Sequence, residues 1–104
     1  MNDEMASTLE YWETTDARQG GAVVSMSQKG VFILCHVNMP IGAKLSIRVF
    51  YPLRDSFDSF PALTRIAGKN LCCIGWEVYE YKLEFAAISE GDRPKLQNAL
   101  TIHE

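Results

Sequence analysis

Long apolar runs are missing from this sequence. No segment approaches the roughly 20 consecutive apolar residues that a membrane-spanning helix requires. The first ten residues, MNDEMASTLE, are acidic, whereas a secretory signal peptide begins with basic residues and continues with an apolar stretch. These two absences predict a cytoplasmic protein that does not interact with the membrane.

Cysteine is scarce and its spacing is wrong for a metal site. The chain has three cysteines, Cys35, Cys72 and Cys73. Adjacent cysteines such as Cys72 and Cys73 rarely bridge each other, because the geometry of a disulfide is narrow. The paired Cys-x-x-Cys or histidine spacing of a zinc site is absent, although His36 follows Cys35. We therefore expect free thiols that pack as small hydrophobic residues, and no metal ion.

Catalytic motifs and an excess of positive charge are also lacking. The two histidines are scattered and no nucleophile has a recognisable base beside it, so we expect no catalytic residue and no enzyme activity. The net charge is −3, and the first 16 residues hold five acids and no base, which leaves ten bases against eight acids in the remaining 88. A nearly neutral body is a poor partner for a polyanion, so polymeric nucleic acid is not an expected ligand.

Short β-favouring segments separated by glycine and proline make up most of the chain. At 104 residues and 47% hydrophobic content we expect one domain over 8–104, preceded by a flexible N-terminus at 1–7. A polar loop is expected at 52–61. In the last strand-like segment the alternation changes parity near Val78 and Tyr79, which indicates a β-bulge or a bend. The expected strands lie at 9–15, 22–27, 31–37, 44–51, 62–67 and 72–88.

The alternation in one strand and the pattern of the C-terminus are the clearest fold signals. Residues 44–51 alternate strictly, so that Leu45, Ile47, Val49 and Tyr51 face inward. Ser89 is positioned to cap a helix whose apolar face is formed by Leu96, Ala99, Leu100 and His103. Six or so antiparallel strands with a final helix predict a mainly β protein, a small β-barrel with a C-terminal α-helix, because closure removes exposed strand edges.

The segment 23–37 carries the candidate binding residues. It predicts two strands joined by a tight turn, with Val24 and Met26 on one face and Ser25 and Ser27 on the outward face. Gly30 is expected to adopt positive φ in this turn, where Lys29 places a cation beside the two hydroxyls. The segment is thus either a local site for a small anion or an ordinary solvated turn.

The order of motifs over residues 20–100 resembles the PilZ domain of bacterial cyclic di-GMP signalling. The resemblance rests on Ser27 with Gly30, on the Pro40-Ile41-Gly42 turn, and on the stretch from Tyr81 to Phe85 that leads into 89–93. It implies a six-stranded antiparallel barrel of the PilZ-like split-barrel type, a role in signalling, and cyclic di-GMP as the ligand without any further cofactor.

The sequence departs from the family at the residues that bind the dinucleotide. PilZ domains that bind it typically combine an R-x-x-x-R segment with a D/N-x-S-x-x-G segment. The second segment keeps its serine and glycine but has Ser25 at its first position, and the first segment is missing. The resemblance implies weak or lost binding, because lysine lacks the arginine fork that pairs with phosphate or guanine. The residues that it assigns to the ligand are Arg18, Ser25, Ser27, Lys29 and Gly30.

The alternative function is a protein-interaction adaptor that binds no small ligand. Its contacts would lie on the C-terminal helix or on the 52–61 loop, which carries Phe57 and Phe60. Exposed aromatic side chains often anchor protein interfaces. The competing interpretation is that these two phenylalanines fold back over the mouth of the barrel.

Overall fold

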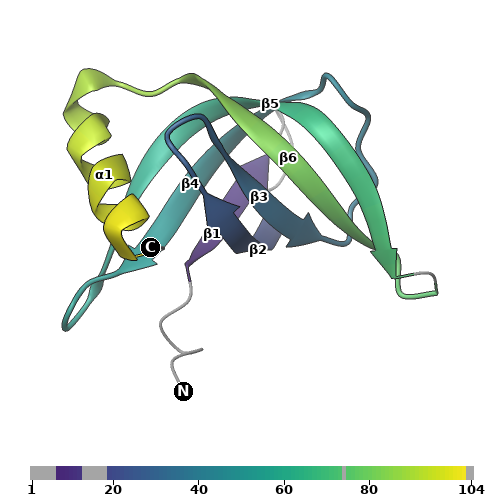
Figure 1. The fold of residues 1–104 in the computed structure, drawn as a ribbon, viewed down its shortest axis with the longest axis horizontal. Coiled ribbons are helices and arrows are strands. Elements are labelled where there is room, and N and C mark those ends of the chain that lie inside the picture. Colours follow the sequence, from purple (N-terminus) through teal and green to yellow (C-terminus); the bar gives the residue numbers. More distant parts are fainter. Residues whose placement is uncertain (1–6, 13–18, 74, 103–104) are drawn as a thin grey trace.

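Six strands close into an antiparallel barrel in a computed structural model that describes residues 7–12, 19–73 and 75–102. The order around the barrel is β1-β2-β3-β6-β5-β4, and β1 pairs with both β2 and β4 (Figure 1). The expected mainly β barrel with a C-terminal helix is confirmed. The elements are β1 (Thr8–Trp12), β2 (Gln19–Met26), β3 (Gly30–Cys35), β4 (Lys44–Pro52), β5 (Phe57–Cys73), β6 (Val78–Ala87) and α1 (Arg93–Ile102).

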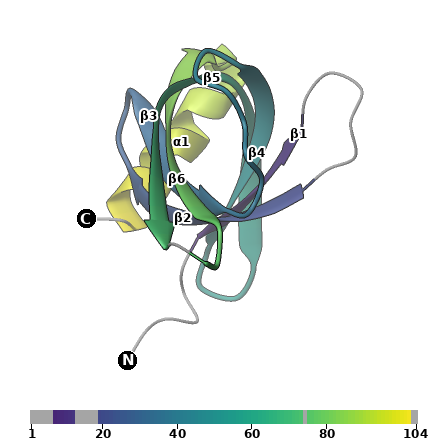
Figure 2. The same cartoon turned by 90° about the vertical axis from the view of Figure 1, so that its right-hand side faces the viewer.

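The core fills the inside of the barrel. The inward residues of β4 were predicted correctly, since Leu45, Ile47, Val49 and Tyr51 are all 0% exposed. Burial of each such side chain stabilises the fold by about 1.5–3 kcal/mol relative to exposure. Helix α1 covers one end of the barrel and adds Leu96 and other apolar residues to the core (Figure 2).

The β3–β4 connection covers the end of the barrel away from α1 (Figure 1). Met39 is buried there, and its backbone N–H donates a hydrogen bond to the Tyr81 hydroxyl over 2.7 Å. The same hydroxyl donates to the carbonyl oxygen of Val37, also over 2.7 Å. Burial raises the pKa of Tyr81, so the hydroxyl keeps the proton that it needs to tie this connection to β6.

Strand β5 is much longer than the sequence indicated. It runs for 17 residues and pairs with β4 from Phe57 opposite Pro52 onward, so the loop comprises only residues 53–56. The expected loop at 52–61 is therefore wrong in extent, because the polar residues around Phe57 hid a strand that β4 holds in register. Bulges opposite β6 bend β5, which lets it continue past Gly68.

The change of parity near Val78 coincides with a reversal of the chain, and the register between β5 and β6 also shifts there, opposite Val78 and Tyr79. Residues 75–77 form a turn between β5 and β6, in which Gly75 has φ +93° and Glu77 has φ +52°. Positive φ is the backbone conformation that tight turns between strands require. The exposed Trp76 lies at the tip of this turn. The continuous strand expected at 72–88 is thus two strands.

Of two cysteines whose side chains the structure describes, one is buried and the other is exposed. Cys35 and Cys72 are free thiols. We expected both to be buried, but Cys72 is exposed and is the extra residue where the register between β5 and β6 shifts. Within the described ranges no group of side chains is suited to hold a metal ion, and no helix there has the length and apolar character to cross a membrane. The expected flexible segment lies outside the described residues up to residue 6, and Ser7 is buried.

Helix α1 is attached to the barrel through Asp58 of β5. Its carboxylate lies 3.4 Å from the Lys95 ammonium and accepts hydrogen bonds from the Ser59 backbone N–H at 2.7 Å and the Tyr51 hydroxyl at 3.4 Å. The pKa of Asp58 is lowered, first by the hydrogen bond from the Ser59 backbone and then by Lys95.

Ser89 does not cap the helix, contrary to expectation. It precedes the short 3-10 turn Glu90–Asp92, and its hydroxyl donates to a carboxylate oxygen of Asp92 over 2.6 Å and not to a backbone group.

We expect Asp58→Asn to lower the melting temperature at neutral pH. A lowered pKa in the folded state means that the ionised carboxylate stabilises the fold above its ordinary pKa of 3.8, and that this stabilisation disappears as the pH falls below that value. The difference in melting temperature between wild type and variant should therefore shrink between about pH 5 and pH 2. Asp55→Asn, in the neighbouring loop, is the control. A difference that stays constant with pH would contradict this role.

Candidate functional site

The β2–β3 hairpin positions the candidate residues through two hydrogen bonds of its turn. The Ser27 N–H donates to the Gly30 carbonyl over 2.9 Å, and the Lys29 N–H donates to the Ser27 hydroxyl over 3.2 Å. Such short-range bonds from serine hydroxyls are typical of turns. Ser27 therefore helps to hold the turn, which leaves the Lys29 side chain exposed at its tip.

A β-bulge in β2 orients Ser25. Val23 pairs with Ile33 and Ser25 pairs with Phe32, so Val24 is the extra residue between them. In a regular ladder Ser25 would face Val31, whose side chain points into the barrel, and a shift by one residue moves a side chain to the other face. The predicted outward position of Ser25 is confirmed. Val24 is exposed and does not share the face of Met26, which corrects the expected alternation.

Gly30 is required for a close approach between strands and not for its φ angle. Its φ is not positive, contrary to expectation. A Cβ atom at this position would lie 2.0 Å from the carbonyl oxygen of Leu83 on β6. Next to it, the backbone N–H of Phe85 donates to the Lys29 carbonyl over 2.8 Å. Glycine thus allows the start of β3 to lie directly against β6.

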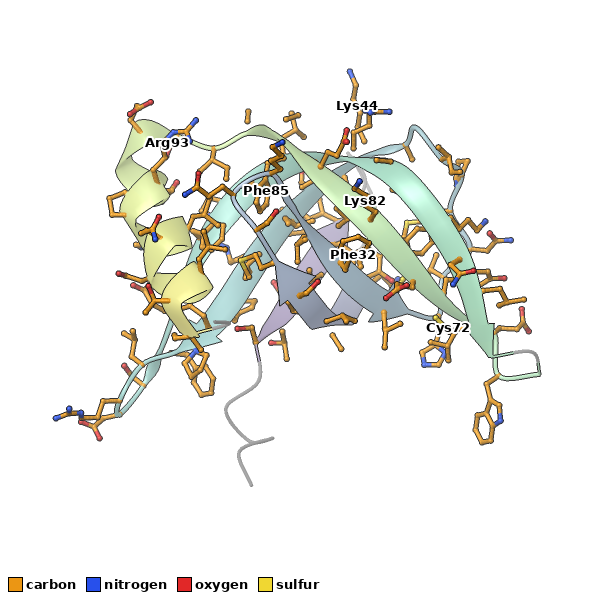
Figure 3. All side chains as sticks on the ribbon, in the orientation of Figure 1. Phe32, Lys44, Cys72, Lys82, Phe85 and Arg93 are labelled. Carbon is orange, nitrogen blue, oxygen red and sulfur yellow. The ribbon has the colours of Figure 1, made fainter. Side chains whose placement is uncertain are left out.

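Four of the five predicted ligand-binding residues line one hollow on the outer face of the barrel. Its volume is about 140 Å³. Arg18, the fifth, lies outside the described residues. A neighbouring hollow of about 400 Å³ shares Lys29 and Glu84 with the first and extends to Arg93 at the start of α1. Figure 3 shows Arg93, Phe85, Lys82 and Phe32 along this side of the barrel. The first hollow is lined by Ser25, Met26, Ser27, Lys29, Gly30, Val31, Phe32, Lys82, Leu83 and Glu84.

The charge in this hollow favours an anion. The carboxylate of Glu84 is paired with the Arg65 guanidinium at 2.8 Å, which offsets its charge. Lys29 and Lys82 make no ion pair with any residue in the described ranges, and both are exposed. Two ammonium groups and two hydroxyls can donate hydrogen bonds, and the oxygens of a phosphate group can accept them.

Sequence reasoning did not identify Phe32 and Lys82 as part of this site. The buried Val31 and Ile33 on either side of Phe32 would have indicated that Phe32 points outward. No comparable signal exists for Lys82, because its position depends on the pairing of β3 with β6, which joins residues about fifty positions apart. That pairing places Lys82 opposite Phe32.

Comparison with solved structures identifies the fold. No protein-family profile and no curated protein matches the sequence. The structure is similar to that of the Bacillus subtilis inhibitor of motility, MotI/DgrA, with a TM-score of 0.75 and 14% sequence identity over 93% of this chain. The match covers 46% of that protein, so this chain spans about half its length. At this identity the similarity supports the PilZ-like resemblance at the level of the fold alone.

We expect Gly30→Ala to destabilise the barrel by about 3 kcal/mol, the upper part of the range for overpacking, because the new methyl group overlaps the Leu83 carbonyl. Chemical denaturation measures this change. Gly20→Ala is the matched control, since a Cβ atom there meets no atom within 4 Å. Equal stability of the two variants would show that β3 and β6 do not lie as close as described.

Proposed function

We propose that this chain is a PilZ-like bacterial signalling module that binds cyclic di-GMP weakly at the hollow beside the β2–β3 turn. The observation that carries the proposal is the convergence of Ser25, Ser27 and Lys29 on one hollow, next to the glycine that fixes the strand approach. Cyclic di-GMP presents two phosphates and two guanines to such a surface. The fold similarity to a protein described as an inhibitor of motility supports a role in signalling.

The weakness of binding follows from the missing arginine pair. An arginine fork makes two parallel hydrogen bonds to a phosphate or to a guanine edge, whereas lysine contributes a single point charge. Loss of two such contacts, each worth about 1–3 kcal/mol, lowers the affinity by roughly two orders of magnitude or more. The module has no catalytic role and needs no cofactor in this proposal.

The second candidate function is a protein-interaction adaptor, and one exposed aromatic residue favours it. Phe57 is 64% exposed at the start of β5, beside the exposed Leu53 of the same hairpin. Phe60 is 0% exposed and belongs to the core. Of the two phenylalanines expected to act together, Phe57 alone is available to a partner.

Isothermal titration with cyclic di-GMP tests the first function. We expect saturable binding with a Kd of about 10–100 μM. Ser25→Ala and Lys29→Ala should each raise the Kd by about five- to tenfold, because each removes a donor to the anion. Arg54→Ala, which removes a cation in the 53–56 loop, is the control and should change the Kd less than twofold. If cyclic di-GMP at about 100 μM produces no heat and no thermal shift, the receptor function is excluded.

Substitution of the two phenylalanines tests the adaptor function. Phe57→Ser should abolish capture of a protein partner without lowering the melting temperature, because the ring is exposed. Phe60→Ala should cost about 3–5 kcal/mol of stability, as expected for a large buried ring. Partner capture and thermal denaturation are measured on the same samples. Unchanged capture by Phe57→Ser would contradict a contact through this hairpin.

A further inference from the structure

An exposed aromatic ring lies in the middle of a polar row on the outer face of the barrel. Strand pairing aligns Ser25 of β2, Phe32 of β3, Lys82 of β6 and Gly68 of β5. Phe32 is 39% exposed, whereas its neighbours in β3, Val31 and Ile33, are buried in the core. Figure 3 shows Phe32 and Lys82 next to each other on this face. A ring of this size is thus presented between a hydroxyl and an ammonium group.

The surface is open on both sides of this ring. The hollow of about 140 Å³ adjoins the ring on the side of Ser25, and another of about 170 Å³, bordered by Gly68, adjoins it on the far side. Gly68 has no side chain, so the space beside Lys82 stays free. Enclosed small-molecule pockets usually measure about 300–1,000 Å³. These smaller hollows form a shallow platform around Phe32, which suits a flat ring and not a globular ligand.

The cations around the platform are distributed unevenly. On the far side, Glu80 lines the second hollow, and the Lys69 ammonium lies 5.2 Å from the centre of the Tyr79 ring. Lys82 borders both hollows, but on the near side the charge of Glu84 is offset by its arginine partner and Lys29 adds a second exposed cation. An anionic group is therefore favoured on the near side, beside Ser25.

We propose that Phe32 is a stacking platform for a purine base and that Lys82, together with Lys29, binds the phosphate attached to that base. This inference rests on the proposed function and assigns two further residues to its site. Lys82 supplies from β6 a cation that compensates for the arginines missing from the N-terminal segment. Base–aromatic stacking is strong enough to matter, since removal of one ring commonly lowers affinity about tenfold or more.

The experiment compares variants by titration with cyclic di-GMP. Phe32→Ala and Lys82→Ala should each raise the Kd about tenfold. Phe32→Leu retains an apolar side chain and the fold but loses the aromatic ring, so it should also raise the Kd. Leu71→Ala, at another exposed apolar position of the barrel, and Arg54→Ala are the controls. In the wild-type complex we expect an intermolecular nuclear Overhauser effect between a guanine H8 proton and the Phe32 ring.

The possible outcomes separate this inference from the proposed function. If wild type binds the dinucleotide but Phe32→Leu and Lys82→Ala change the Kd less than twofold, the platform is overturned and the receptor function remains. If wild type shows no binding, both are overturned. If the variants lose affinity while their melting temperatures match wild type, and the controls do not lose affinity, the platform is supported.

Discussion

The contact between the start of β3 and β6 is the constraint on which both the barrel and its candidate site depend. Gly30 allows the backbone of β3 to approach the Leu83 carbonyl, where no Cβ atom fits. The same pairing inserts β6 between β3 and β5 and so completes the barrel. It also forms the floor of the hollow that the two serines and Lys29 surround. The glycine at position 30 is thus required both for closure of the barrel and for the shape of the hollow.

The pairing of β3 with β6 is also a long-range contact, of the kind that we expect to form late in folding. These strands are separated by about fifty residues, and contacts of such separation require the closure of a long loop. The β2–β3 hairpin and the β5–β6 hairpin, by contrast, join neighbouring segments through short turns. The hollow combines residues of the β2–β3 hairpin with residues of β6, so the site requires that β3 and β6 pair.

Local signals in the sequence were sufficient for the barrel class and for half of the site. Strict alternation in β4 predicted its inward residues, and the serines and Lys29 were recognised because they lie within one hairpin. The extent of β5 was missed because polar residues interrupt its alternation of apolar and polar side chains. The first residues of β5 are held in the strand by their pairing with β4, which the sequence pattern does not show. The bulge at Val24 and the position of Lys82 depend on partner strands, so no local pattern reports them.

Pro61 lies where β5 has β4 as its one strand neighbour, because pairing with β6 begins only at Leu63. The stretch from Phe57 to Ala62 therefore has one edge that pairs with no second strand. Proline lacks the amide hydrogen that an incoming strand would need, and natural proteins use it at such edges to discourage self-association. We therefore expect Pro61 to disfavour the addition of a strand from a second copy of the chain at this edge.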